Sequence, residues 1–366
     1  MLRRDAVFCR TPPPPASPHK VPQDPTETNH QVMLKQRPTL LTHFTHFTRL
    51  TRLTRLTRLT LLTLLSALNL RGEAHITGAN AEPRPAEPRP AEPPPTPIIA
   101  IGDLHADLPA AQRAFHLAGV TDAEGRWAAR GVTVVQTGDL TDRGPDGEPL
   151  LRWIRGLEPQ AEAAGSRFVV LLGNHEVMNL HGDWRYVSQG DLRGFGGLEA
   201  RRRAFSLGGV LGAQGGALGE RGEWAAWLLG KEAVVRVGDT VFVHGGVSEL
   251  FAGPVEGLSR QVSEAILRDP RHPVLGDNGP LWYRGYWLYD EPRACDEALR
   301  ALARMGARRM VMGHTTQRDG RVHSRCGGRL FAIDTGISAL YGGRAAALRV
   351  VGDEVFAVYE GGEVRL

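Results

Sequence analysis

The chain has 366 residues and a net charge of +4, but its composition changes sharply near residue 97. Residues 1–97 hold 16 of the 25 prolines and only 2 of the 44 glycines, which excludes a packed domain there, because such sequence buries too little apolar surface to offset its ordering entropy. Residues 1–81 carry 11 basic and 4 acidic side chains, so residues 82–366 carry 33 and 36, a net charge of −3, which argues against a nucleic-acid-binding surface there.

Residues 1–97 form a predicted leader with two open interpretations. Thr48 to Thr60 repeats Thr-Arg-Leu, and a period of three drifts around a helix without forming a stable apolar stripe. A low-complexity expansion would leave the protein cytoplasmic. A secretory signal, which we favour, would comprise a basic region, the apolar stretch Leu59 to Leu70 and a cleavage site at Ala79-Asn80-Ala81, giving a periplasmic or extracellular protein. The apolar stretch is too short to span a bilayer, and a proline-rich tether follows it.

From residue 98 onward, short apolar runs that end in glycine predict buried strands. The runs are Pro97–Gly102, Val132–Gly138, Phe168–Gly173, Thr240–Gly245 and Met310–Gly313. The stretches Leu108–Leu117 and Ala294–Met305 between them predict helices. Apolar strands that alternate with helices indicate an α/β fold with sheets covered on their faces, and functional loops are expected at the carboxyl ends of the strands.

Polar side chains of the kinds that bind metals follow each run. They are Asp103 and His105, then Asp139, then Asn174, then His244, and finally His314. A single Gly-Asp pair after a strand is more often a turn or helix cap, but five strand ends in order, each with an oxygen or imidazole ligand, favour a site. This mixed set suits manganese, iron or zinc, and six ligands predict two ions that share a carboxylate.

The motifs resemble those of the calcineurin-like metallophosphoesterases, in the phosphoprotein phosphatase branch. The matching strings are Gly102–His105, Gly138–Gly144, Gly173–Glu176, His244–Gly246 and Gly313-His314. The string Gly173–Asn179, with Arg185-Tyr186 after it, is similar to that of the Shewanella-like protein phosphatases. The resemblance spans about residues 98–340 and departs at Ala106, where the family usually has glycine. It implies a catalytic domain over residues 98–366 built of two packed mixed β-sheets flanked by helices, an α/β/β/α sandwich.

The resemblance also implies a role for each site residue. Asp103, His105 and Asp139 would hold one divalent ion, and Asp139, Asn174, His244 and His314 a second, with Asp139 as the bridge; Mn²⁺ is expected, with iron or zinc as alternatives. Arg143 and Arg284 would bind the phosphate, because a guanidinium group matches two oxygens. His175, oriented by Asp142, would protonate the leaving oxygen. Since His175 directly follows Asn174, we expect the two side chains to diverge from an extended loop.

The activity implied is hydrolysis of a phosphomonoester by metal-activated water, on phosphorylated Ser/Thr or Tyr of a protein or on a small phosphoester. Hydrolysis of dinucleoside polyphosphates is an alternative, but those enzymes commonly carry Asp where this chain has Glu176. A non-catalytic phospholigand-binding module is another, but it would be expected to have lost a ligand or the acid histidine, and all are present.

Other residues in or beside the motifs are expected to have structural roles. Asp107 is expected to cap the helix from Leu108, Glu176 to orient a loop, and Asp334 to support His314. Gly190–Gly222 is expected to be an insertion over the site. The basic residues Arg201–Arg203 could contact an anionic substrate, although a solvated helix face is the commoner explanation. Whether Cys295 and Cys326 pair stays open, as does the oligomeric state.

Overall fold

The computed structural model describes residues 96–209 and 220–366. The predicted leader lies outside these residues, apart from its last two positions. All five predicted strands are present, as β1 (Ile98–Ile101), β2 (Thr133–Gln136), β3 (Arg167–Val170), β5 (Thr240–Val243) and β6 (Arg309–Met312). Six strands were not predicted from the apolar runs: β4 (Val234–Val237), β7 (His323–Arg325), β8 (Leu330–Ala332), β9 (Ala347–Val351), β10 (Glu354–Tyr359) and β11 (Gly362–Arg365).

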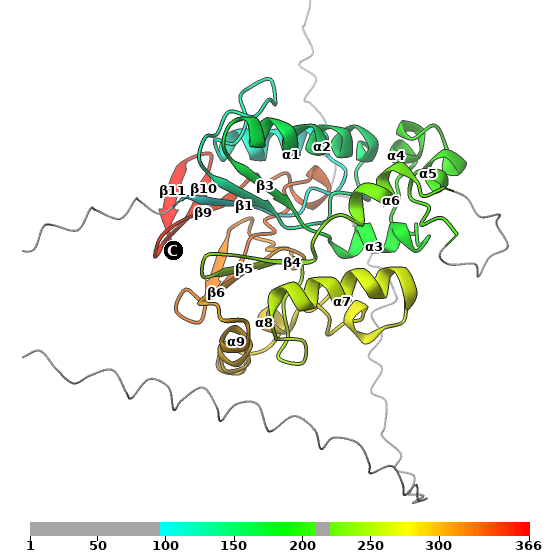
Figure 1. The fold of residues 1–366 in the computed structure, drawn as a ribbon. Coiled ribbons are helices and arrows are strands. Elements are labelled where there is room, and N and C mark those ends of the chain that lie inside the picture. Colours follow the sequence, from blue (N-terminus) through cyan, green and yellow to red (C-terminus); the bar gives the residue numbers. More distant parts are fainter. Residues whose placement is uncertain (1–95, 210–219) are drawn as a thin grey trace, which may run out of the picture. The chain divides into compact units, whose positions relative to one another are not determined.

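The strands of the described residues form two mixed sheets. The six-stranded sheet has the order β11-β10-β9-β1-β2-β3, and the five-stranded sheet has the order β4-β5-β6-β8-β7 (Figure 1). β1, β2 and β3 run parallel, as do β5, β6 and β8. Because parallel strands end at the same edge of a sheet, the five glycine-containing loops lie at two neighbouring edges.

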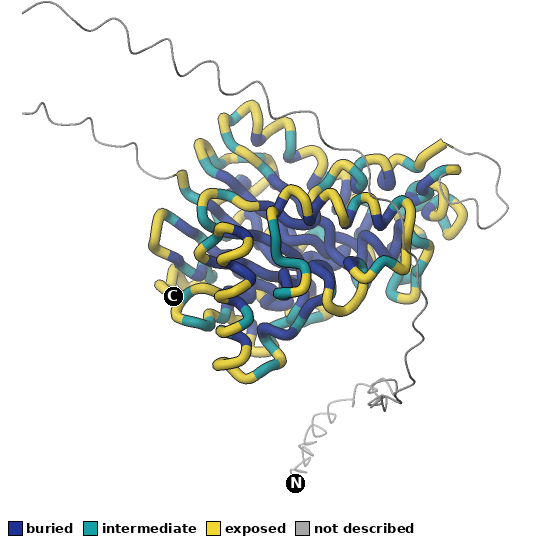
Figure 2. Tube along the Cα trace, turned by 60° about the horizontal axis from the view of Figure 1, so that its bottom comes forward, coloured by how far each residue is buried: buried dark blue, intermediate teal, exposed yellow. Residues whose placement is uncertain are grey.

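Apolar side chains point alternately to the two faces of each sheet, and both faces are buried. In β1, Ile98 and Ala100 belong to the apolar cluster between the sheets, together with Phe242 of β5. Their neighbours Ile99 and Ile101 belong to the cluster beneath the helices. Successive side chains of a strand point to opposite faces, so a continuous apolar run needs cover on both sides. Figure 2 shows the resulting buried interior.

Helices cover the outer face of each sheet, which confirms the α/β/β/α arrangement. α1 (Leu108–Leu117) and α2 (Gly147–Ala163) lie on the six-stranded sheet, whereas α7 (Val255–Arg268), α8 (Gly285–Leu288) and α9 (Glu291–Met305) lie on the five-stranded sheet (Figure 1). The predicted cap is confirmed, because Asp107 accepts a hydrogen bond from the amide of Ala110 at 3.1 Å. α9 begins at the cap Asp290 and ends at Gly306, which has a left-handed φ of 61°.

Short helices fill the connection between β3 and β4. They are α3 (Asn174–Leu180), α4 (Gln189–Gly194), α5 (Leu198–Ala204) and α6 (Glu223–Leu228). Two 3₁₀ turns, η1 (Pro273–Leu275) and η2 (Ala339–Tyr341), complete the helical elements of the described residues. None of the helices in this part of the chain is both long and apolar enough to cross a bilayer.

Candidate active site

The loops after β1, β2 and β6 have a strained backbone. Among the described non-glycine residues with positive φ are His105 (47°), Ala106 (52°), Asp139 (54°) and His314 (62°). The amides of Leu104 and His105 both donate to the carbonyl oxygen of Asp139, at 3.0 and 2.9 Å, which fixes the first loop against the second. Left-handed backbone at non-glycine residues is held only where the surroundings over-determine it, and it concentrates at functional sites.

Glycine is required beside two of the predicted carboxylate ligands. A methyl group added at Gly173 would overlap the carboxylate of Asp139, and one added at Gly313 would overlap that of Asp103. These two glycines therefore permit the carboxylates to pack closely against the backbone.

His244 lies at the centre of a cluster of hydrogen-bond acceptors. Its Nδ1 is 2.9 Å from the carbonyl oxygen of Thr137 and must carry the proton, so Nε2 presents a lone pair. This Nε2 faces Oδ1 of Asn174 at 2.8 Å, Nδ1 of His314 at 3.1 Å and Oδ1 of Asp139 at 3.3 Å. Acceptors this close repel one another unless a cation lies between them. The donor set therefore fits a divalent metal ion.

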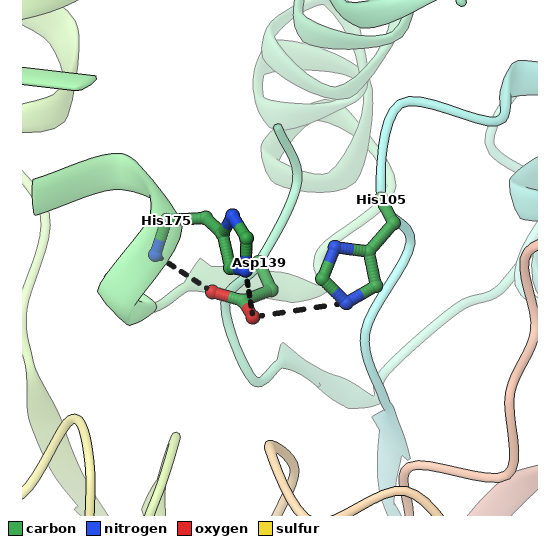
Figure 3. A group of neighbouring side chains, drawn as sticks. All are labelled: His105, Asp139 and His175. Atoms are coloured by element: carbon green, nitrogen blue, oxygen red, sulfur yellow. Dashed lines mark hydrogen bonds and ion pairs between the residues drawn. The ribbon is translucent and has the colours of Figure 1, made fainter. Parts of the chain in front are cut away.

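A second group of potential ligands lies on the other side of Asp139. Nε2 of His105 is 3.8 Å from Oδ2 of Asp139 and 3.9 Å from Oδ2 of Asp103, and Nε2 of His175 is 3.9 Å from Oδ2 of Asp139. Figure 3 shows Asp139 between the two imidazole rings. Asp139 thus belongs both to this group and to the His244–His314 group. Its two oxygens face different groups, as a bridging ligand requires.

Burial and local charge set the ionisation of these groups. Burial raises the pKa of Asp103 well above its usual value, and the negative charges of Asp334 and Asp139 raise it further. Burial alone would raise the pKa of Asp139 as well, but without a metal ion protonated imidazoles at His244 and His175 would outweigh it and lower that pKa well below its usual value. Burial lowers the pKa of His105 to about 4, so this ring is neutral at pH 7 and has a lone pair that could bind a metal. A bound cation would stabilise the charged form of the buried carboxylates Asp103 and Asp139.

Glu176 holds the loop that carries Asp139, which confirms its predicted role. Its carboxylate accepts hydrogen bonds from the amides of Asp139, Leu140 and Thr141 at 2.9, 2.9 and 3.0 Å. It also accepts one from the amide of Gly173 at 2.8 Å. One buried side chain therefore joins the second and third loops.

The predicted pairing of His175 with Asp142 is present. Nδ1 of His175 is 2.7 Å from Oδ2 of Asp142, and both side chains are buried. Burial alone would lower the pKa of His175, but the charges of Asp139 and Asp142 overcome this and raise it. The expectation of an extended loop was wrong, because Asn174 and His175 form the first turn of α3. Their side chains nevertheless diverge, since Asn174 faces His244 while His175 faces Asp139.

Both predicted phosphate arginines line the same cavity as the candidate metal ligands. The cavity has a volume of about 160 Å³, or about five water molecules by liquid volume. Arg143 stacks on Tyr186, with its guanidinium carbon 3.8 Å from the ring centre, and its Nε is buried without a hydrogen-bond partner in the described chain. Arg284 donates to the carbonyl oxygen of His314 at 2.6 Å and forms no ion pair with any described residue. The guanidinium groups of both arginines are therefore available to bind an anion.

Several residues of the cavity were not predicted. They are Tyr186, Trp282, Thr316 and Tyr341, and Tyr341 stacks on His105 with ring centres 4.8 Å apart. Tyr186 was present in the Arg185-Tyr186 string but had no assigned role. Tyr341 follows no metal-type motif, so the sequence carried no signal for it.

Two structural expectations need correction, and one question that the sequence left open is answered. Arg201 does not lie on a solvated face, because it is 0% exposed; only its neighbours Arg202 and Arg203 are exposed. Asp334 does not hydrogen-bond the His314 ring; it accepts from the hydroxyl of Thr316 at 2.6 Å. Cys295 and Cys326, whose pairing the sequence left open, form a disulfide with a Cα–Cα distance of 5.3 Å. The disulfide joins α9 to the turn after β7.

Comparison with known proteins agrees with this geometry. The family model for calcineurin-like phosphoesterases matches residues 96–318, which include every proposed metal ligand. The chain belongs to the calcineurin-like phosphoesterase family. These enzymes use divalent metals, which the cluster of His and Asp side chains is suited to bind.

Two relatives and one solved structure illustrate the similarity of this chain to known proteins. An uncharacterized protein of Schizosaccharomyces pombe is 39% identical over 289 residues, covering 74% of this chain and 83% of its own. Shewanella-like protein phosphatase 2 of Arabidopsis thaliana is 34% identical, covering 67% and 72%. A solved cold-active protein-tyrosine phosphatase of a psychrophilic Shewanella species superimposes with a TM-score of 0.62 at 24% identity, covering 74% of this chain and 80% of that one, and shows the shared fold.

Proposed function

We propose that this chain is a metal-dependent phosphomonoester hydrolase that acts on phosphorylated proteins. One observation supports it most: the acceptor cluster at Asp139, the imidazole of His175 and the guanidinium groups of Arg143 and Arg284 all line one cavity. This is the set that phosphoryl transfer to water needs, namely a cation site, an acid and charge to balance the phosphoryl oxygens. The similarity to a Shewanella-like protein phosphatase supports a protein substrate.

Each residue of this chain has a distinct part in the proposed reaction. Arg143 and Arg284 bind the phosphoryl oxygens and orient the ester bond. His175, whose Nδ1 is held by Asp142, presents Nε2 to the cavity and donates a proton to the leaving oxygen. Tyr186 supports Arg143 from beneath, and Tyr341 supports His105.

We propose two ions, with Mn²⁺ as the first choice and iron or zinc as alternatives. Asp103, His105 and Asp139 would hold one, and Asp139, Asn174, His244 and His314 the other. When bound, such ions activate water and neutralise phosphoryl charge. The nitrogen and oxygen donors fit these metals, and the two faces of Asp139 support the bridge.

Phosphate release from purified full-length protein tests the proposal. With added Mn²⁺ we expect turnover of an aryl phosphate and of phosphoserine, phosphothreonine or phosphotyrosine peptides, and loss of activity in EDTA. Turnover of a dinucleoside polyphosphate with none of the phosphopeptides would favour the alternative hydrolase. Phosphopeptide binding without phosphate release would favour the non-catalytic module.

We also propose that the protein is exported. The support from the described residues is the disulfide between Cys295 and Cys326, because disulfides persist in oxidising compartments. The basic and apolar segments before Ala81 provide the second support.

A further inference from the structure

A fully buried arginine lies behind the Asp142–His175 pair. Arg201 belongs to α5, its side chain is 0% exposed, and its guanidinium carbon is 5.1 and 4.7 Å from the ring centres of Phe195 and Phe205. Taking a guanidinium group out of water is costly, so a buried arginine needs partners that use its donors. Its polar partners here are Asp191, Asp142 and Asn179.

The first partner anchors the guanidinium group. Nε and Nη2 of Arg201 lie 3.0 and 2.9 Å from Oδ2 of Asp191, a buried residue of α4. The fixed fork of the guanidinium group then directs the remaining donors toward Asp142 and Asn179. Nη2 is 3.4 Å from Oδ1 of Asp142, and Nη1 donates to Oδ1 of Asn179.

The contact with Asn179 determines which way its amide faces. Because the guanidinium group is only a donor, it must meet the amide oxygen, and the amide nitrogen must then face the other way. That nitrogen donates to Oδ1 of Asp142 at 2.9 Å and to the carbonyl oxygen of His175 at 2.8 Å. Oδ1 of Asp142 is thereby held from two sides, and Oδ2 is left for Nδ1 of His175 at 2.7 Å.

We propose that Arg201 is a positioning residue for the His175 acid: it fixes the carboxylate of Asp142, directly and through Asn179, so that the imidazole is held with Nε2 toward the leaving oxygen. The inference rests on the proposed function. It assigns a catalytic purpose to the segment between β3 and β4, because α4 and α5 supply Asp191 and Arg201 and place the cation behind the acid.

Leaving-group dependence separates positioning from a merely structural role. In the Mn²⁺-loaded full chain, Arg201→Met should lower kcat about tenfold on a phosphoserine peptide, whose alkyl leaving group needs a proton, and less than about threefold on an aryl phosphate with a good leaving group. Metal content should not change. A general loss of structure would reduce both rates alike, and equal losses on the two substrates would overturn the proposal.

A double variant tests whether the effect passes through His175. In the His175→Asn background, Arg201→Met should cost no further activity on the phosphoserine peptide, because the group that it orients is gone. A loss of the same size in both backgrounds would overturn the proposal. If His175→Asn itself slows both substrates equally, the proposed acid fails, and that result is distinct from failure of Arg201 alone.

Further variants keep the test decisive if Arg201→Met fails to fold with Asp191 left uncompensated. Arg201→Met/Asp191→Asn removes both charges of the anchor. Arg201→Lys keeps a buried cation without the fork, so we expect a melting temperature near the wild type and a smaller but still selective loss on the peptide. Arg202→Met, at the exposed neighbour, and Arg309→Met, at a buried arginine paired with Asp239, are the controls and should show no selectivity. A folded Arg201→Lys with no selective loss would overturn the proposal.

Discussion

Nδ1 of His175 lies 2.7 Å from Oδ2 of Asp142, while Nε2 of the same ring faces the cavity 3.9 Å from Asp139. Nδ1 is held by Asp142, and Nε2 is available to donate a proton to the substrate. We expect His175→Asn to lower kcat about 10²–10⁴-fold on an alkyl phosphoester and much less on an aryl phosphate. Both ions should stay bound, as metal analysis would show. Loss of metal, or equal losses on the two substrates, would contradict the acid assignment.

Asp139 faces both groups of ligands, so it should be needed for both ions. Asp139→Asn should lower metal content and phosphate release together, because an amide oxygen binds a bridged pair of cations far more weakly than a carboxylate does. Atomic emission on dialysed protein measures the metal content, and turnover of an aryl phosphate measures phosphate release. Asp319→Asn, at an exposed carboxylate paired with His323, is the control. Full occupancy and normal turnover in Asp139→Asn would reject the bridge.

Ala106 has a φ of 52°, which explains the family's preference for glycine there. Ala106→Gly should relieve backbone strain, whereas Ala110→Gly, at an equally buried alanine within α1, should weaken the helix. Because both variants lose one buried methyl group, the difference in their free energies of unfolding isolates the backbone. We expect Ala106→Gly to be about 1–2 kcal/mol more stable than Ala110→Gly in urea denaturation. Equal stabilities would show that Ala106 is unstrained.

Asp191 should give stability a pH dependence of its own. Burial raises the pKa of Asp191 to about 6, although Arg201 opposes the rise. Between pH 4 and pH 6 the folded chain holds this proton and the unfolded chain does not, so the contribution to stability is full below pH 4 and is lost as the pH rises through 6.

Asp191→Asn, which does not titrate, provides the reference. From pH 4 to pH 7 the wild type should lose about 3 kcal/mol of unfolding free energy relative to this variant. Urea denaturation at several pH values measures the difference in unfolding free energy between the two proteins. The contributions of the other titrating groups largely cancel in this difference. If the wild type instead gains unfolding free energy relative to Asp191→Asn as the pH rises, the attraction of Arg201 outweighs the effect of burial on the pKa of Asp191.

The leader gives a prediction that the described residues do not test. If Ala81 ends a signal peptide, protein from a native-type host should begin at Glu82 and lie outside the cytoplasm. Amino-terminal sequencing of fractionated cells provides the measurement. An intact amino terminus at Met1 or Met33 on cytosolic protein would reject export.

The strands and ligands were predictable because their signals are local. A continuous apolar run that ends in glycine places the next polar residue at a strand end, and parallel strands bring such ends together without further information. Asp103, Asp139 and His314 were identified as candidate ligands in this way. The family resemblance supplied the roles of His175 and Arg284, which spacing alone leaves undetermined.

Arg201 was misplaced because its environment is set by residues far from it in sequence. Three consecutive arginines have the composition of a solvated surface, and the partner Asp142 lies 59 positions earlier. Phe195 and Phe205, which enclose the guanidinium group, carry no periodic pattern that indicates which face of α5 is buried. The antiparallel pair β9 and β10 was missed because Arg349 in β9 interrupts the apolar run and because side chains of both strands alternate between buried and partly exposed.

The ligands come from both layers of the sandwich. Asp103, Asp139 and Asn174 follow strands of the six-stranded sheet, whereas His244 and His314 follow strands of the five-stranded sheet. The two sheets therefore cannot separate without dismantling the ligand set. Bound cations would add their binding free energy to the cohesion between the layers, about 2.7 kcal/mol for a site at a metal concentration 100 times its Kd. A metal centre held by these residues would thus also act as a cross-link between the two halves of the core.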